Sequence, residues 1–335
     1  MRKVCTVLIT LILIMLFSGC YDNKEIDSLA TVMAVGIEKE EDERLYTFSV
    51  ADSGGITSES KGDGASMKCF KQKAKNIKDA TAEVNKQLSK SLSFSHLSAI
   101  VFSADCAKED LSGELGFFEK QVSVRPQTMI AISHLKPSDY LEKLSPVLEV
   151  NPEKYFQKVF GDSKRYVSYL RLCDFTNAYH TDTTCLAPVI TGNSDKETIS
   201  EDDININSSA LIWKGKSVAE IDDNWFLGLV LSDKSVKYDK MEIQRTQKPK
   251  FDFKLTKSKL KVDITLKVKS DGKLNKKKAK KDAEEFLNNS SKQVLDTINV
   301  KQLVKKIFFL QKKYEGYNWD EIIKNAEFNV KFKVV

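Results

Sequence analysis

The sequence lacks the patterns that mark most enzymes and metal proteins. It has three histidines in 335 residues, and no two stand at the spacing of metal ligands on one helix. No GxSxG, HExxH, GxxxxGK[ST] or GxGxxG segment occurs, so the common hydrolase, metalloprotease and nucleotide-binding signatures are missing. The six cysteines include no CxxC pair, which leaves zinc and thioredoxin-like chemistry unsupported. We therefore expect a non-enzymatic protein that needs no cofactor or metal.

One short segment does fit a catalytic pattern. Ser58 and Lys61 satisfy SxxK, in which a lysine activates a serine nucleophile, but no KTG accompanies them. They lie in the Gly- and Ser-rich residues 51–66, which we expect to form a loop. A pattern with two fixed letters arises easily by chance in a chain rich in Ser and Lys, so we interpret it as a coincidence. A cell-wall hydrolase that uses these two residues stays as an alternative.

Other isolated polar and aromatic residues favour structural roles. His96 begins an apolar segment, as a hydrogen-bonded structural histidine would. The adjacent Asp222 and Asp223 precede an expected helix, where acids interact favourably with the helix dipole. We interpret the three tryptophans as core or interface anchors: Trp213, Trp225 and Trp319. Trp225 on an exposed helix face would instead indicate a groove for a partner.

The amino-terminal segment has the parts of an export signal. Arg2 and Lys3 precede an apolar run at 4–17, which is shorter than the roughly 20 residues that span a bilayer. The run ends in LFSGC, which resembles a bacterial lipobox, where diacylglycerol is attached to the cysteine and the chain is cut before it. We predict a signal peptide at residues 1–19 and lipidation of Cys20. An uncleaved anchor or an ordinary secretory signal is the alternative.

Four cysteines would remain after export: Cys69, Cys106, Cys173 and Cys185. Disulfides are permitted outside the cytoplasm, yet the spacing of these residues indicates no framework. We interpret them as isolated buried thiols. A bridge between Cys173 and Cys185 is the alternative.

The formal charge of +6 hides an asymmetry between the two ends of the chain. Residues 21–60 hold ten acidic and three basic residues, whereas 234–281 hold eighteen basic and five acidic residues. The basic stretch is interpreted as a solvated sheet face with a lysine-rich turn. Contact with anionic lipid headgroups is the alternative, since each nearby base contributes about 1 kcal/mol. No nucleic acid partner is expected, because an exported protein is separated from nucleic acid and because the sequence contains no aromatic-basic RNA motif.

The first 200 residues alternate between strand and helix patterns. TVMAVGIEKE and LYTFSV predict a hairpin, and 77–88 has helical spacing. HLSAIVFS and TMIAIS are predicted to pair in parallel, because the segment between them is long enough for a crossover helix. Residues 137–179 favour helices, among them RYVSYLRLCDFTNAY. We place a domain boundary near residue 200 and a further division of 20–200 into 20–145 and 146–200.

The last third, 201–335, predicts a second domain. SSALIW and SVAEI flank a Lys-Gly-Lys turn as in a hairpin, and NWFLGLVLSD predicts a helix. KLKVDITLKVKS alternates strictly, residues 275–314 have helical spacing, and FNVKFKVV closes the chain as a strand. The predicted fold class is mixed α/β and α+β, with several domains and with helices packed on mixed and antiparallel sheets.

Several segments together resemble the Ger(x)C lipoproteins, the C subunits of spore germinant receptors. Cys20-Tyr21-Asp22 followed by EIDSLATVMAVGIE resembles the start of that family. SLSFSHLSAIVFS, SSALIWKGKSVAEIDDNWFLGLVLSD and KKYEGYNWDEIIKNAEFNVKFKVV are similar to its later segments. The sequence differs in having Tyr21 where the family commonly has Trp.

The resemblance implies a lipid-anchored subunit at the outer face of the spore inner membrane. It implies α/β domains, no catalytic residues, and two membrane-embedded partners, the A and B type subunits of the receptor. Its bilayer contact would be the acylated Cys20. An anchored solute-binding protein that captures a nutrient itself is the other alternative.

Overall fold

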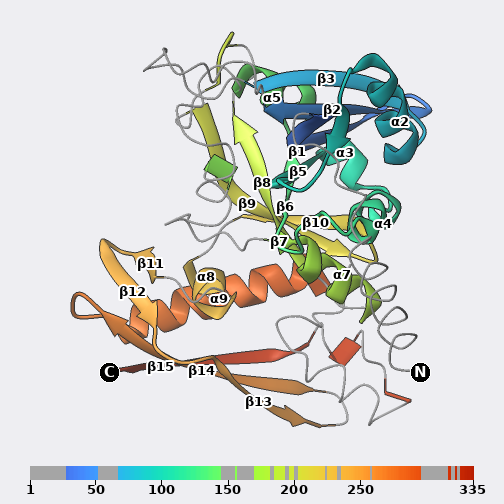
Figure 1. Ribbon diagram of the computed structural model, residues 1–335. Helices are drawn as coiled ribbons and strands as arrows, with labels where there is room; N and C mark the ends of the chain where they lie inside the picture. Colours follow the sequence, from blue (N-terminus) through green and yellow to red (C-terminus); the bar gives the residue numbers. More distant parts are fainter. Residues whose placement is uncertain are drawn as a thin grey trace, which may run out of the picture.

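The computed structural model describes most of the chain beyond residue 27. The described residues are 28–51, 67–144, 155–156, 170–181, 185–192, 196–199, 203–222, 225–231, 235–256, 259–295, 316–317, 321–322 and 325–335. They form two sheets with helices packed on them, which confirms the predicted mixture of α/β and α+β structure (Figure 1). Within these residues, no helix has both the length and the apolar character needed to cross a bilayer.

Ten of the described strands form the first sheet. Its main path is β10-β9-β8-β6-β5-β1-β2-β3, while β4 pairs with β1 and β7 pairs with β6. The strands are β1 (Leu29–Glu40), β2 (Glu43–Ala51), β3 (Met67–Ala74), β4 (Ser91–Ser93), β5 (Ala99–Ser103), β6 (Met129–Ser133), β7 (Leu170–Arg171), β8 (Cys185–Gly192), β9 (Ile204–Trp213) and β10 (Lys216–Asp222).

The centre of this sheet is parallel and its margins are antiparallel. β1, β5, β6 and β8 pair in parallel, whereas the hairpins β1-β2 and β9-β10 are antiparallel. The predicted parallel pairing of HLSAIVFS with TMIAIS is therefore confirmed. Both hairpins predicted from the sequence are also confirmed, and Lys214 and Gly215 have the positive φ that a tight two-residue turn requires.

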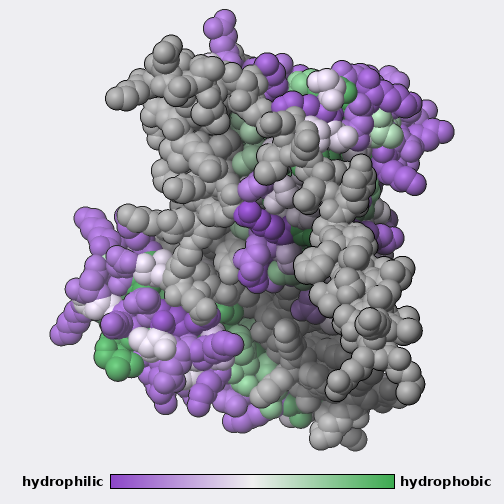
Figure 2. Space-filling view, in the orientation of Figure 1, coloured by the Kyte–Doolittle hydropathy of each residue, from purple (hydrophilic) through white to green (hydrophobic). Residues whose placement is uncertain are grey.

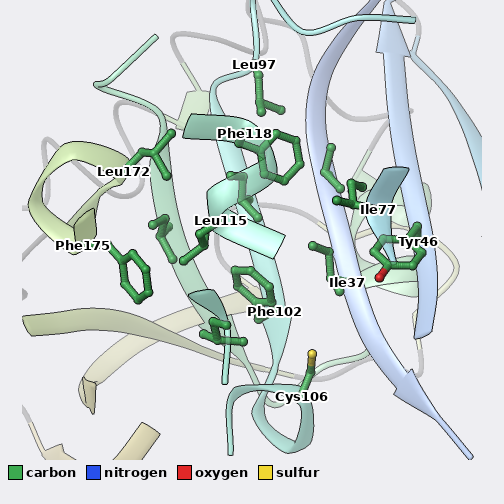
Figure 3. Close-up of a cluster of buried hydrophobic side chains, with 14 of the residues drawn as sticks. Ile37, Tyr46, Ile77, Leu97, Phe102, Cys106, Leu115, Phe118, Leu172 and Phe175 are labelled. Atoms are coloured by element: carbon green, nitrogen blue, oxygen red, sulfur yellow. The ribbon is translucent and has the colours of Figure 1, made fainter. Parts of the chain in front are cut away.

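Helices cover both faces of the first sheet. They are α2 (Ile77–Gln87), α3 (Ala104–Ala107), α4 (Ser112–Lys120), α5 (Pro137–Leu144) and α7 (Leu172–His180). On one face, α2, α4 and α7 share a large apolar core with the strands, whose members include Ile37, Phe102 and Phe118 (Figure 3). On the other face, α5 packs in a second core. Burial of both faces explains why the central strands read as continuous apolar runs.

The second sheet is mixed. Its path is β11-β12-β14-β13, and β15 pairs in parallel with β14. The elements are α8 (Trp225–Leu231), β11 (Ser235–Tyr238), β12 (Met241–Arg245), β13 (Lys250–Leu255), β14 (Leu260–Ser270), α9 (Lys276–Leu295) and β15 (Glu327–Val334). Alternate residues of β14 are buried, and Ala279, Ala283 and Leu287 of α9 lie in the same core. The predicted alternating strand with a helix on one face is therefore confirmed.

The pairing of the strands bears on the expected boundary near residue 200. β9 follows that point in the chain and pairs with β8, which precedes it. The boundary therefore falls inside one hydrogen-bonded sheet, and the change from the first sheet to the second lies between β10 and β11. A division into domains, including one near 145, stays a prediction.

Two local differences from the sequence predictions have clear reasons. Leu170 and Arg171 were expected within a helix but pair with β6, and the helix begins only at Leu172. The strand β3 was not predicted, because MKCFKQKA carries three lysines and shows no strict alternation. It lies at the edge of the sheet, where charged residues are common.

Candidate functional site

The proposed lipidation site and the SxxK segment lie outside the described residues. Cys20 precedes residue 28, and Ser58 and Lys61 fall between β2 and β3. Both interpretations of these residues stay predictions.

The three histidines lie in separate parts of the first sheet and its helices. His96 is exposed in the turn before β5, and His180 is exposed at the end of α7, where its ring is perpendicular to that of Tyr179. His134 follows β6, and its Nε2 lies 2.8 Å from Oε2 of Glu220. Among the described residues, no group of three or more His, Cys, Asp and Glu side chains converges as metal ligands would.

Trp225 belongs to the core of the second sheet. It is 9% exposed, and its ring centroid lies 4.4 Å from that of Tyr238 and 5.9 Å from that of Phe332. The interpretation of Trp225 as a core anchor is confirmed. Trp213 is partly exposed, with the Lys214 ammonium 4.7 Å from its ring centroid. Trp319 and Asp223 lie outside the described residues, as does the side chain of Asp222.

The four cysteines of the described part are free thiols. Cys106 and Cys185 are buried, and Cys69 and Cys173 are partly exposed. Burial raises the pKa of Cys106 to about 11 and that of Cys185 to about 12. The interpretation as isolated thiols therefore fits the structure, with two of them only half-buried. Their raised pKa values make the buried pair poor nucleophiles.

A cavity of about 690 Å³, lined by both polar and apolar residues, lies at one end of the parallel strands of the first sheet. Its walls come from the carboxyl ends of β1, β5 and β6, from the start of α3, and from residues 217–220 of β10. In open α/β sheets, this edge is where ligands bind most often. The volume suits a small molecule. This cavity is the best candidate site in the part of the chain that the structure describes.

The inner wall of the cavity contains a buried carboxylate. Glu38 is 6% exposed, and its Oε1 accepts a hydrogen bond of 2.7 Å from Oγ of Ser138 in the first turn of α5. This helix packs closely on β1, because a Cβ on Gly36 would lie 2.9 Å from Cβ of Pro137. Oε2 of Glu38 and Oγ of Ser133, which lines the cavity two strands away on β6, are buried without a partner among the described residues. Each of these two atoms can form a hydrogen bond with a ligand in the cavity.

The rim of the cavity carries charges of both signs. His134 lies 2.8 Å from Glu220, which also lines the cavity, and Asp105 pairs with Lys108 at 2.8 Å. The hydrogen bond from Lys108 holds the pKa of the Asp105 carboxyl below its ordinary value. Lys136 is an exposed base on the same rim. The arrangement provides a carboxylate inside and mixed charges outside, which suits a small molecule with a protonated amine.

Sequence reasoning did not select Glu38. The residue stands in VGIEKEEDER, so it was assigned with its neighbours to the charged end of a hairpin. The usable signal was its place directly after the buried run of β1, at the carboxyl end of a strand that pairs in parallel.

A second buried carboxylate has a structural role. Glu114 of α4 is 4% exposed and accepts hydrogen bonds from Arg44 Nη1 at 2.8 Å, Tyr46 Oη at 2.6 Å and the Ile77 backbone N–H at 3.1 Å. Burial, followed by the hydrogen bond to Glu114, raises the pKa of Tyr46 well above its ordinary value. The carboxylate therefore ties α4 to β2 and to the start of α2.

Comparison with known proteins gives the following similarities. Residues 22–192, about half of the chain, match the family described as the spore germination protein N-terminal domain. Spore germination protein KC of Bacillus subtilis (strain 168) is 22% identical over 245 residues, which are 69% of this chain and 60% of that protein. The chain thus spans about 60% of the length of this curated relative. A crystal structure of the GerBC protein is 14% identical, with a TM-score of 0.49 over 90% of this chain and 96% of the other.

Proposed function

The chain belongs to the spore germination protein family that its residues 22–192 match, and from this premise we propose that it is a lipid-anchored subunit of a spore germinant receptor. In this proposal it is not an enzyme, and it supports nutrient-triggered germination through contacts with other subunits. The match to the family carries the proposal. The name of its relative, spore germination protein KC, points to the same process.

The proposed anchor is acylated Cys20, at the outer face of the spore inner membrane. Each buried lipid methylene contributes about 0.8 kcal/mol, and two acyl chains hold a protein stably where a single chain is marginal. A protein held in this way stays in a thin layer above the bilayer, so its effective concentration near membrane-embedded partners rises. Weak contacts with the A and B type subunits are then sufficient.

The proposed mechanism is a shift between two states of the receptor. A nutrient that binds the complex changes the relative stability of these states only if contacts differ between them. The described part of this subunit would supply some of the differential contacts. Its first sheet is mixed and is buried on both faces by close-packed cores, which suits it to transmit a change at one edge to a partner at another.

Substitution of Cys20 tests the anchor. Cys20→Ala should move the protein from the spore membrane fraction to the aqueous fraction and reduce nutrient-triggered germination. Cys69→Ala is the matched control, because it removes a partly exposed thiol and leaves the anchor intact. An aqueous Cys20→Ala protein that supports full germination would contradict the proposal.

Affinity purification tests the partners. A tagged protein from dormant spore membranes should retain two multispanning subunits after mild detergent extraction. Recovery of the protein alone, under conditions that preserve other membrane complexes, would contradict the subunit role. The hydrolase alternative predicts instead that Ser58→Ala abolishes function.

The cavity favours a second candidate function, in which the anchored protein itself binds a small solute. The half-satisfied carboxylate of Glu38 is the specific observation, and small primary amines with their alcohol analogues are the probes. An amine should raise the melting temperature saturably, Glu38→Gln should remove the effect, and Glu40→Gln on the cavity rim should retain it. The absence of a saturable shift with every amine would eliminate this function and leave the first proposal intact.

A further inference from the structure

The second sheet has one covered face and one exposed face. Along β14, the inward residues are buried in the core with α9, and Lys261, Thr265 and Lys269 point to the opposite side. Figure 1 shows α9 between the strands β13 to β15 and the rest of the molecule. The exposed face of these strands is therefore directed away from the first sheet.

Charge is distributed unevenly along this exposed face. At one end, Lys261 lies opposite Glu327 and pairs with it at 2.8 Å. Asp263 lies in the next outward position, and Asn329 donates a hydrogen bond of 2.6 Å to it. Acids therefore compensate the lysines at this end.

The other end of the face is predominantly basic, with two exposed acids, Asp271 and Glu242 of β12, at its margin beside Lys269. We call it the lysine face, and it consists of Lys250, Lys267, Lys269, Lys331 and Lys333. Thr265 lies in register with both Lys250 and Lys331, and Lys267 lies directly opposite Lys333. No ion pair involving these five lysines occurs among the described residues. Figure 2 shows hydrophilic surface around a small hydrophobic patch near the carboxyl end of the chain, where Val334 and Val335 are exposed.

Lys267 and Lys333 lie directly opposite each other in the sheet, and this placing of two like charges is electrostatically unfavourable. Like charges directly opposite on antiparallel strands are known to destabilise a sheet, and the spacing of neighbouring parallel strands is similar. Lys267 and Lys333 have this arrangement, with Lys331 one outward position away on β15. Anions outside the chain would relieve this repulsion.

The shape of the lysine face favours a planar partner. Its ammonium groups stand on flexible stems along three neighbouring strands, and they do not converge on a pocket as residues that bind one phosphate do. The outward residues of β13, β14 and β15 include no aromatic side chain on which a nucleic acid base could stack. Lysines close to an anionic bilayer each strengthen binding.

We propose that the lysine face binds the anionic headgroups of a phospholipid bilayer. This inference adds to the proposed function an orientation, with the second sheet against the membrane and the first sheet farther from it. It rests on the proposed function only for the identity of the membrane in the cell, because purified components test the contact itself.

The test uses the mature chain from residue 20 with Cys20→Ala, so that no acyl chain contributes. Sedimentation with vesicles of phosphatidylcholine, with or without about one third phosphatidylglycerol, measures the partition coefficient. The protein should bind only the anionic vesicles, and binding should weaken as the salt concentration rises. A variant of the lysine face has four substitutions, Lys267→Gln, Lys269→Gln, Lys331→Gln and Lys333→Gln. At about fivefold per lysine, it should bind roughly six hundredfold more weakly.

The matched control removes four exposed lysines from the other sheet and its helices: Lys75→Gln, Lys78→Gln, Lys86→Gln and Lys120→Gln. It has the same net charge as the first variant and should bind within about threefold of the parent protein. Equal loss in both variants would overturn the proposal, since it would show an effect of net charge alone. Failure of the parent protein to bind anionic vesicles would also overturn the proposal.

Two further measurements complete the test. The urea midpoint of the lysine-face variant should equal or exceed that of the parent, because a repulsion is removed. A single-stranded oligonucleotide should not displace the protein from vesicles, and displacement at equal phosphate concentration would overturn the lipid assignment. Failure of vesicle binding leaves the germination and partner tests of the proposed function unaffected.

Discussion

Replacing Glu114 with alanine tests how the helices are held on the first sheet. The carboxylate is 95% buried as a side chain, and it accepts hydrogen bonds from Arg44, Tyr46 and the Ile77 backbone. The substitution leaves the guanidinium of Arg44, whose side chain is only 17% exposed, a buried hydroxyl and a buried N–H without their common acceptor. Removal of one partner from a buried ion pair typically costs about 3–5 kcal/mol. Arg44 retains a second contact to Glu109 at 3.1 Å, so we expect about 3 kcal/mol.

Equilibrium urea denaturation of the unlipidated mature chain measures this loss. With a slope of about 1–3 kcal/mol/M, the midpoint should fall by at least about 1 M. Glu109→Ala is the control, because this carboxylate pairs with Lys39 and Arg44 but is 40% exposed. An exposed pair contributes at most about 1 kcal/mol. Equal losses from the two substitutions would refute the reasoning, because burial would then not decide the strength of these contacts.

Three further predictions concern packing and thiols. Gly36→Ala should destabilise the fold by about 1–3 kcal/mol, because the new Cβ would lie 2.9 Å from Cβ of Pro137. Gly113→Ala, whose new Cβ would meet no atom within 4 Å, should stabilise the fold by up to about 1 kcal/mol. Thermal denaturation of the two variants compares these effects. Alkylation at pH 8, followed by mass spectrometry, should modify Cys106 and Cys185 only after unfolding, and modification of either in the native protein would contradict their burial. Burial raises the pKa of Cys185 to about 12, so its thiol stays neutral in the folded state at a pH where it ionises in the unfolded state, near pH 9. The free energy of unfolding should therefore fall as the pH rises above about 9. It should fall less steeply in Cys185→Ala.

The elements with strong local patterns were predictable from the sequence. The helix α2 has Ile77, Ala80 and Val84 on one face and the capping residue Asn76 before it. The strand β14 buries every second residue, which is the period that its sequence shows. The parallel pair β5 and β6 followed from two apolar runs and the length of chain between them.

The candidate site was less predictable, because its parts are far apart in the chain. Glu38 and Ser138 are separated by 100 positions, and the tight packing of α5 on Gly36 brings them together. The carboxylate of Glu114 meets Tyr46 across 68 positions. A single sequence shows the charge of each residue but not the neighbour that burial will give it.

The sequence alone determined the apolar run at 4–17, the periods of the main helices and strands, and the segments that resemble one family. These properties are local, since they depend on residues within a few turns of helix or one strand. Only the tertiary structure decided that the strands after residue 200 extend the first sheet and that five lysines gather at one end of the second. Strand order and register determine which charges meet, and both result from the packing of distant segments into shared cores.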